Sequence, residues 1–342
     1  MTEYLKIIAS GDTLTDEQAS GAMHLLLKGE STPEQTAGLL MGLRGRGESI
    51  DELTAFTRVM REYAVPVHIE DGKAIDVVGT GGDGSGTFNI STTTMLVCAG
   101  AGATVAKHGN RSVSSKCGSA DVLRELGVFV ELPAAAVEKC IADAGLGFMF
   151  APLFHPALRF VMPVRRALAV RTFFNILGPL CNPAGVQRGV FGAFSEDVAD
   201  TMGTILSRLG GERVYSVHSE DGLDEYSIAA PTRYTYHASG AAPVKGVSAP
   251  EDLGLKTAPL SSLKGGDAEV NAGIIRRILD GDHGPHRDVV LLNAAYALVT
   301  ADIAENPADG VSRAAASIDS GAALKSLQAL AQASHDHRPT GD

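Results

Sequence analysis

The chain has 342 residues, of which 44% are apolar and 20% charged, and these proportions exclude global disorder and allow a substantial core. A net charge of −11 does not suit a protein whose main partner is nucleic acid. The four cysteines are scattered without a CxxC pair, so we expect neither a structural zinc site nor a disulfide framework. The N-terminus is too polar for a signal peptide, and no apolar run approaches the ~20 residues that span a bilayer. We therefore expect a cytoplasmic location and no membrane association.

Residues 1–68 are predicted to be helical throughout. Three helix starts share a capping box, in which a Thr or Ser hydroxyl caps one amide and a Gln or Glu three positions later reaches back to another. These boxes are Thr15–Gln18, Thr32–Gln35 and Ser49–Glu52. Behind the third, apolar residues recur at helical spacing, so this helical domain presents an apolar face that needs a partner. The Pro- and Arg-rich segment 160–188 is expected to pack back on it.

After Pro66, short β-type runs alternate with helical segments, a pattern that predicts an α/β sheet covered by helices. We assign residues 69–159 and 189–332 to this α/β domain and residues 333–342 to a polar tail. The expected strands are Ile75–Val78, Ala103–Ala106, Val128–Glu131, Val190–Phe194 and Val214–His218.

A glycine-rich loop, GTGGDGSGTFNIST, follows the first expected strand and begins with the Gly-x-Gly-x-x-Gly spacing of dinucleotide-binding turns. A Rossmann site needs an acidic residue at the end of the next strand, but Lys107 and His108 stand there, although an NADP site tolerates a cation. The backbone amides of such a loop form a cradle for an anion. We therefore favour a phosphate site over a nucleotide cofactor or a ligand-free turn. Asp83 would then order the turn, or hold ribose hydroxyls or a cation.

Two further polar segments follow expected strands, and both should emerge at the same edge of the sheet. KHGNRSVSSKCG, from Lys107 to Gly118, offers cations and hydroxyls to a second phosphate group, or is a solvated basic loop. Residues 220–225 offer adjacent carboxylates, which suit Mg²⁺ or form an acidic turn in solvent. Beside two phosphate cradles, a metal that neutralises a pyrophosphate is the more economical interpretation.

Three arginines, Arg165, Arg166 and Arg171, recur at nearly helical spacing in the segment RFVMPVRRALAVRTFFNILGPLCNP. One of them is a candidate for bidentate binding of a carboxylate. For Arg166 and Arg171, a structural role is at least as strongly favoured.

Together these blocks resemble the anthranilate phosphoribosyltransferase family of tryptophan biosynthesis. The likeness runs from about residue 5 to 330 and includes KHGNRSVSSKCGSADVLRELG, RTFFNILGPLCNPA, DGLDE, GGDAEVNAGIIRRIL and RDVVLLNAA. It implies a small all-helical domain plus a larger α/β domain with a central mostly parallel sheet, of the nucleoside phosphorylase/phosphoribosyltransferase type. It also implies a homodimer joined through the helical domain. The reaction it implies is transfer of the phosphoribosyl group of 5-phosphoribosyl 1-pyrophosphate (PRPP) to the amine of anthranilate, with Mg²⁺.

The resemblance further implies roles for individual residues. Lys107 and Arg165 would act in catalysis, and the metal would be held by Ser91, Asp224 and Glu225. The residues that would contact anthranilate are Gly79, Asn110, His155, Arg165 and Pro179. Those that would bind PRPP are Gly79, Gly82, Asp83, Thr87, Asn89, Ile90, Ser91, Thr92, Lys107, His108, Gly109, Asn110, Arg111, Ser112, Val113, Ser114, Ser115 and Ser119. Two departures from the family pattern, Ala169 for Gly and Cys181 for Thr, lie beside this site.

The amine of anthranilate is already nucleophilic, so we expect catalysis by positioning and by electrostatic stabilisation of pyrophosphate, without a covalent nucleophile. His108 is either a general base or a neutral structural imidazole. Two alternatives stay open. A pyrimidine nucleoside phosphorylase shares the architecture, but the KHGN loop and the Asp–Glu pair argue against it. A non-catalytic nucleic-acid-binding relative is disfavoured by the negative net charge.

Overall fold

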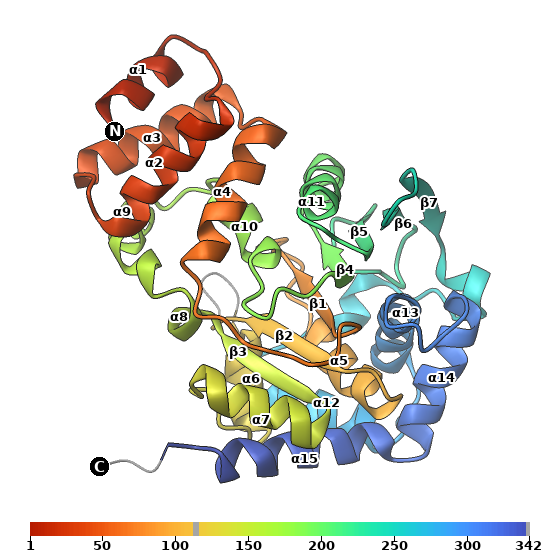
Figure 1. Ribbon diagram of the computed structural model, residues 1–342. Helices are drawn as coiled ribbons and strands as arrows, with labels where there is room; N and C mark the ends of the chain where they lie inside the picture. Colours follow the sequence, from red (N-terminus) through yellow and green to blue (C-terminus); the bar gives the residue numbers. More distant parts are fainter. Residues whose placement is uncertain (112–115, 340–342) are drawn as a thin grey trace.

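The computed structural model describes residues 1–111 and 116–339 (Figure 1). Its N-terminal part is a helical unit made of α1 (Thr2–Ala9), α2 (Asp16–Lys28), α3 (Pro33–Arg46) and α4 (Ile50–Glu62). The capping boxes predicted at the starts of α2, α3 and α4 are confirmed, each with both of its reciprocal hydrogen bonds. The prediction succeeds because a capping box depends only on residues three positions apart.

The apolar faces of these helices pack against two helices from much later in the chain. α9 (Met162–Leu168) contacts α3, and α10 (Phe174–Leu180) contacts α4. Phe173 lies between Phe56 of α4 and Phe174, with ring centroids 4.6 and 4.5 Å apart. Burial of an aromatic side chain of this size contributes about 1.5–3 kcal/mol. The N-terminal helices therefore depend for their core on a segment distant in sequence.

A seven-stranded sheet forms the larger part of the molecule, with the strand order β3-β2-β1-β4-β5-β6-β7. The first five strands in this order run parallel, whereas β6 and β7 are antiparallel additions at one edge. The strands are β1 (Ile75–Gly79), β2 (Val105–Gly109), β3 (Leu146–Phe150), β4 (Arg188–Gly192), β5 (Arg213–Ser219), β6 (Thr232–Ala238) and β7 (Val244–Ser248). The small helical unit beside a mostly parallel sheet confirms the predicted fold class.

Both faces of the parallel sheet are buried. Adjacent residues of one strand enter different apolar clusters. Val190 joins the core under α5 (Ile90–Gly100) and α13 (Pro285–Thr300), whereas Phe191 joins the core of α11 (Glu196–Arg208) and the helical unit. This follows from the alternation of side chains along a strand. The covering helices are α5 (Ile90–Gly100), α6 (Ser119–Glu125), α7 (Ala134–Ala144), α11 (Glu196–Arg208), α12 (Ala268–Leu279), α13 (Pro285–Thr300), α14 (Pro307–Asp319) and α15 (Ala322–Asp336), with the short α8 (Ala151–Phe154) leading towards α9. Within the described ranges, no helix combines the length and apolar character that crossing a bilayer requires.

Two expectations from sequence are corrected. Residues 128–131 are not a strand; they run in an irregular segment in which Phe129 N donates to Ser334 Oγ of α15, and β3 lies further on, at Leu146–Phe150. The polar end of the chain is also more ordered than expected, because α15 continues to Asp336. There, His335 Nε2 lies 3.1 Å from the carbonyl oxygen of Gly127, and His337 Nε2 lies 2.6 Å from Asp143 Oδ2. Local composition does not reveal such docking contacts, which are made to distant residues.

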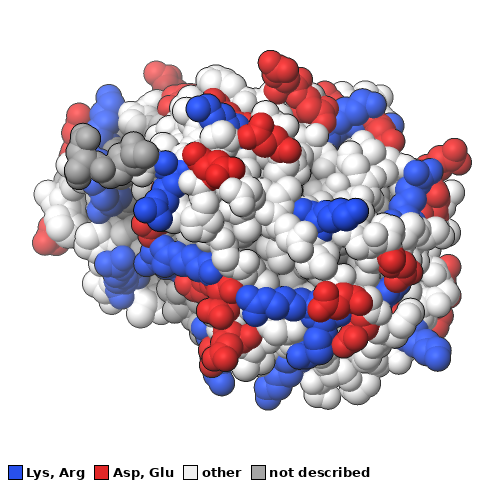
Figure 2. Space-filling view, turned by 90° about the horizontal axis from the view of Figure 1, so that it is seen from below, with Lys and Arg blue, Asp and Glu red and all other residues white. Residues whose placement is uncertain are grey.

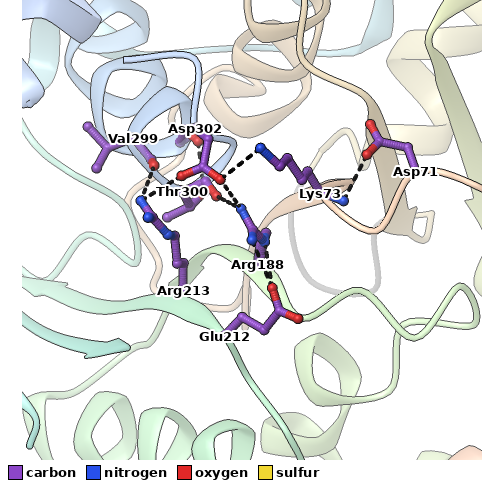
Figure 3. A network of polar contacts seen from close by, with 9 residues as sticks. Asp71, Lys73, Arg188, Glu212, Arg213, Val299, Thr300 and Asp302 are labelled. Carbon is purple, nitrogen blue, oxygen red and sulfur yellow. Dashed lines mark hydrogen bonds and ion pairs between the residues drawn. The ribbon is translucent and has the colours of Figure 1, made fainter. Parts of the chain in front are cut away.

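Asp302 joins three parallel strands at the amino edge of the sheet (Figure 3). Its carboxylate accepts from Arg188 of β4 at 2.8 Å and from Arg213 of β5 at 2.7 Å, and it lies 3.2 Å from Lys73, just before β1. Asp302 itself has a left-handed backbone, with φ of 59°. The hydrogen bond from Arg188 is the main reason why the pKa of Asp302 lies below its usual value.

We predict that Asp302→Gly lowers the free energy of unfolding by about 1 kcal/mol, because it removes charge-assisted hydrogen bonds that are partly exposed to solvent. Glycine adopts the left-handed backbone without strain, so no backbone clash adds to the loss. The pKa of Asp302 is lower in the folded state, so the stabilisation is complete above the unfolded pKa of about 4 and is lost as pH falls through the folded value. Urea unfolding at pH 7 and at pH 3 measures this; an equal difference between variant and wild type at both values would contradict it.

Candidate active site at the carboxyl edge of the sheet

The sheet has a topological switch point between β1 and β4. The chain adds β2 and β3 on one side of β1, and then returns to place β4 and β5 on its other side. In open α/β sheets, ligands bind outside the carboxyl ends of the strands at such a switch point. The loops that follow β1, β2 and β5 all reach this place. Gly81 N donates to Asp224 Oδ2 at 2.6 Å, and Ser91 N donates to Glu225 Oε1 at 3.0 Å. The structure thus brings the glycine loop and the acidic pair together.

The glycine loop between β1 and α5 is built from left-handed turns. Gly81, Gly82, Gly84 and Gly86 have φ values of 67°, 70°, 77° and 65°. Asp83 orders the turn, since its Oδ1 accepts from Ser85 N at 3.1 Å and from Ser85 Oγ at 3.0 Å. This is one of the roles that the sequence left open for Asp83.

The loop leads into the N-terminus of α5, where the first amides of the helix are concentrated. Thr92 in this first turn is 1% exposed, and its hydroxyl has no hydrogen-bond partner among the described residues. Helix N-termini favour anions because their amides are unpaired and the helix dipole is positive there. The start of α5 is therefore suited to a phosphate group.

Asp224 approaches the ends of two strands so closely that only glycine fits opposite it. A Cβ atom on Gly192, the last residue of β4, would overlap the backbone carbonyl oxygen of Asp224. A Cβ atom on Gly79, the last residue of β1, would overlap the Asp224 carboxylate. Because Gly79 and Gly192 have no side chains, the loop that carries Asp224 and Glu225 can lie against both strand ends.

Lys107 brings a buried cation into the same site. It is 2% exposed, and its Nζ donates to the carbonyl oxygen of Val77 at 2.5 Å and to Ser91 Oγ at 3.3 Å. Burial lowers the pKa of Lys107, while attraction by Asp76, Glu225 and Asp224 opposes this. The amine that Lys107 extends from the middle of β2 is thus held among carboxylates.

The pKa values of the two carboxyl groups, Asp224 and Glu225, are raised. Burial raises the pKa of Asp224 to about 7, and the charge of Asp83 acts in the same direction. Burial and then the charge of Asp224 raise the pKa of Glu225 well above its usual value. Additional positive charge at this place would favour the ionised carboxylates.

Arg165 lies on α9, on the side of the helical unit. Its half-buried guanidinium stacks on Phe174 with 5.1 Å to the ring centroid and donates to the sulfur of Met162 at 3.6 Å. Burial lowers the pKa of Arg165. Within residues 1–111 and 116–339, no hydrogen bond joins it to the glycine loop. Arg171, in contrast, donates to the carbonyl oxygen of Gly82 and stacks 4.5 Å from the Phe194 ring centroid, so it links the α9–α10 segment to that loop.

Known proteins match the chain over almost its whole length. Residues 71–324 match the model of the glycosyl transferase family, a/b domain, and residues 2–64 match the helical bundle domain of the same family. The anthranilate phosphoribosyltransferase of Salinibacter ruber is 54% identical over 98% of this chain and 99% of its own length. That of Moorella thermoacetica is 48% identical over 94% and 95%.

The chain belongs to the anthranilate phosphoribosyltransferase family.

Solved structures of this family share the fold. The enzyme of Thermus thermophilus superposes with a TM-score of 0.91 at 43% identity, covering 97% of this chain and 99% of that one. The enzyme of Saccharomyces cerevisiae, in complex with PRPP and Mg, superposes with a TM-score of 0.90 at 25% identity, covering 98% of each chain. A further structure of the yeast anthranilate phosphoribosyltransferase is in complex with 4-fluoroanthranilate.

The family resemblance implied Mg²⁺, and the residues present fit that ion. Within the described ranges, no group of three or more His, Cys, Asp or Glu side chains forms a metal centre by itself. Mg²⁺ does not require one, because it usually binds through one or two carboxylates and takes its other ligands from water and substrate phosphates. Asp224 and Glu225 supply two carboxylates whose ionisation is disfavoured without further positive charge.

The second phosphate loop expected for this family is seen only in part, because Ser112, Val113, Ser114 and Ser115 lie outside the described residues. At its start, the carbonyl oxygen of Asn110 accepts from Ser119 Oγ at 3.1 Å. At its end, Asn89 Nδ2 donates to the carbonyl oxygen of Cys117 at 3.3 Å, which ties this loop to the glycine loop.

His108 and His155 form a buried pair with ring centroids 5.0 Å apart. Burial lowers the pKa of His108 to about 3 and that of His155 to about 4, so both rings are neutral at physiological pH. Neither His155 nor Pro179, which is buried in α10, makes a hydrogen bond to the glycine loop within the described ranges. Sequence reasoning overlooked Asp76 and Asn182, whose buried side chains are joined at 2.7 Å and of which Asp76 also accepts from His108 N at 3.4 Å. Asp76 was visible as an acid inside an apolar strand.

We predict that Gly192→Ala lowers turnover at least about 10-fold and destabilises the fold by about 1–3 kcal/mol, because the new methyl group displaces the backbone of Asp224. Gly45→Ala is the matched control, since a Cβ atom there meets open space on a helix and should stabilise it slightly. Steady-state kinetics and thermal unfolding check both variants. Wild-type activity in the Gly192 variant would contradict the packing argument.

Proposed function

We propose that the chain transfers the phosphoribosyl group of PRPP to the amine of anthranilate, forming N-(5-phosphoribosyl)anthranilate and pyrophosphate in tryptophan biosynthesis. The observation that carries this proposal is the junction of the glycine loop, Lys107 and the Asp224–Glu225 pair at one switch point of the sheet. Two phosphate-binding loops beside two carboxylates suit a sugar that carries a phosphate and a magnesium-bound pyrophosphate. The yeast relative in complex with PRPP and Mg supports the same assignment.

The proposed division of labour follows the positions of the residues. PRPP binds to the glycine loop, to the first turn of α5 and to the loop after β2. Ser91, Asp224 and Glu225 hold Mg²⁺, which supplies positive charge to the pyrophosphate. Anthranilate lies towards the helical unit, where Arg165 binds its carboxylate. The residues proposed to border anthranilate are Gly79, Asn110, His155, Arg165 and Pro179.

In the reaction, the lone pair of the anthranilate nitrogen forms the bond to C1 of the ribose while the bond from C1 to pyrophosphate breaks. The bonding electrons leave with pyrophosphate, and the nitrogen loses one proton. Lys107 and the amides at the start of α5 favour the negative charge that develops on the leaving group. His108 is neutral and buried, which favours its structural role over that of a general base.

We also propose the larger organisation. Residues 1–68 with 160–188 act as one domain and residues 69–159 with 189–332 as the other, and of the predicted tail 333–342 the residues 333–336 complete α15. The protein is a cytoplasmic homodimer joined through its helical domain. Exposed apolar side chains there support this proposal, among them Met41 at 41% and Phe160 at 41% exposure. Light scattering in solution measures the mass of the assembly.

Each of the two alternative functions has its own test. A pyrimidine nucleoside phosphorylase would cleave thymidine with inorganic phosphate, a reaction that the Asp–Glu pair does not explain. A nucleic-acid-binding relative would need a positive surface. On the face shown in Figure 2, however, Lys and Arg side chains are interspersed with Asp and Glu. A phosphorolysis assay and a salt-dependent gel-shift assay distinguish these alternatives from transfer to anthranilate.

We predict that combining Asp224→Asn with Glu225→Gln lowers turnover about 10²–10³-fold and removes the response to Mg²⁺, because the amides cannot supply the negative charge that the ion requires. The consumption of anthranilate, followed by its fluorescence during a magnesium titration, measures both effects. A double variant that retains the wild-type magnesium response would refute the metal assignment.

We predict that Arg165→Ala raises the Michaelis constant for anthranilate about 10-fold or more and leaves that for PRPP within about two-fold, because a charge-assisted pair with a carboxylate contributes about 1.5–3 kcal/mol. Arg338→Ala is the control, since Arg338 also stacks on an aromatic ring, Phe129 at 5.3 Å. An equal rise in both Michaelis constants would rule out a role of Arg165 in binding the anthranilate carboxylate.

A further inference from the structure

The metal-binding pair of the proposed function lies in a segment without regular secondary structure. Residues 223–228 belong to neither a helix nor a strand, so no ladder of backbone hydrogen bonds holds Asp224 and Glu225. Upstream, the carbonyl oxygen of Asp224 lies against Gly192. The contacts that hold the chain directly after Glu225 therefore determine the orientation of the Asp224 and Glu225 carboxylates.

The side chain of Asn293 from α13 provides that support. Tyr226 N donates to Asn293 Oδ1 at 3.0 Å, and Asn293 Nδ2 donates to the carbonyl oxygen of Tyr226 at 2.8 Å. One amide thus makes with Tyr226 both hydrogen bonds that a neighbouring strand would make with an extended residue. Tyr226 directly follows Glu225, so the contact holds the backbone next to the metal ligands.

Asn293 is itself held in one orientation. It is 1% exposed, and the second hydrogen of Nδ2 is donated to the carbonyl oxygen of Val289 at 2.9 Å, one turn earlier in α13. Both amide hydrogens are therefore used, and a flipped amide would place a nitrogen opposite the donor of Tyr226. The helix that carries it is buried over Val289–Thr300 and packs on β1, β4 and β5.

A second residue of α13 acts on the same segment. The Tyr226 ring stacks on Tyr296 with centroids 3.9 Å apart and 10° between the planes. Tyr296 lies three residues after Asn293, which places both side chains on one face of the helix. α13 therefore holds Tyr226 by its backbone and by its ring.

We infer that Asn293 is a positioning residue that orients Asp224 and Glu225 for Mg²⁺ by clamping the backbone of Tyr226. The inference rests on the proposed function for the identity of the metal site. It gives a role to the segment RDVVLLNAA, to which the proposed function assigns no binding residue. Residues that orient metal ligands typically contribute 10–100-fold to metal affinity.

Two substitutions test the clamp. Asn293→Leu removes both hydrogen bonds at similar volume, and Asn293→Asp keeps the acceptor but sets an oxygen against the Tyr226 carbonyl oxygen. We expect each to raise the half-saturating metal concentration about 10-fold or more, with the anthranilate Michaelis constant within about two-fold. The metal is measured in two ways: Mn²⁺ binding in the presence of PRPP, by electron paramagnetic resonance, and a Mg²⁺ titration of anthranilate consumption.

Thr300→Val is the matched control. It removes a buried hydrogen bond in the same helix, from Thr300 Oγ1 to the carbonyl oxygen of Ala297 at 2.7 Å, and should lower thermal stability without changing metal affinity. If neither Asn293 variant folds, Tyr296→Leu, which removes the ring stacked on Tyr226 and leaves the hydrogen bonds of Asn293 in place, should weaken Mn²⁺ binding about three-fold.

Folded variants that bind Mn²⁺ as wild type does would overturn the inference, and so would equal losses in Thr300→Val. A wild-type protein that binds Mn²⁺ and PRPP but does not consume anthranilate would overturn the proposed acceptor instead. The two failures are therefore distinguishable.

Discussion

The contact between the Asp224 backbone and the ends of β1 and β4 is the constraint on which the site depends. The two strand ends carry glycine, so the loop after β5 can cross them and deliver Asp224 to Gly81 N. Any larger residue would separate the acidic pair from the glycine loop. The register of β1, β4 and β5 must also be correct, and Asp302 ties these strands together at the opposite edge.

Several charged groups are buried around this contact, and their arrangement explains why they are tolerated. Lys107 lies among Asp76, Asp224 and Glu225, so its cation has opposite neighbours, while burial raises the pKa of Asp224 and Glu225 and favours their neutral forms. Buried ions are costly unless they are paired and hydrogen-bonded. The apolar layers on both faces of the sheet supply the stability that such a site does not.

The parts of the molecule that could be predicted from sequence are those specified by near neighbours. The caps at Thr15, Thr32 and Ser49 depend on a residue three positions away, and the glycine loop is a continuous motif. The fold class and the reaction were predicted from the resemblance to the family.

What could not be predicted depends on partners distant in the chain. The ordered contact of His337 with Asp143 is one example, and the irregular course of residues 128–131 is another. The clamp of Asn293 on Tyr226 joins residues 67 positions apart, and nothing in the local pattern around either one indicates it.

The glycines of the first loop and those at the strand ends are restricted for different reasons. A Cβ atom at Gly81, Gly84 or Gly86 would contact no other part of the protein, so within the protein these positions are restricted by their left-handed backbone. Asn and Asp tolerate that conformation better than other residues with side chains. At Gly192 no space is left for a Cβ atom, so no residue with a side chain fits there. A substitution in the loop therefore costs backbone strain and brings a side chain into the proposed PRPP site, whereas a substitution at Gly192 displaces the acidic pair itself.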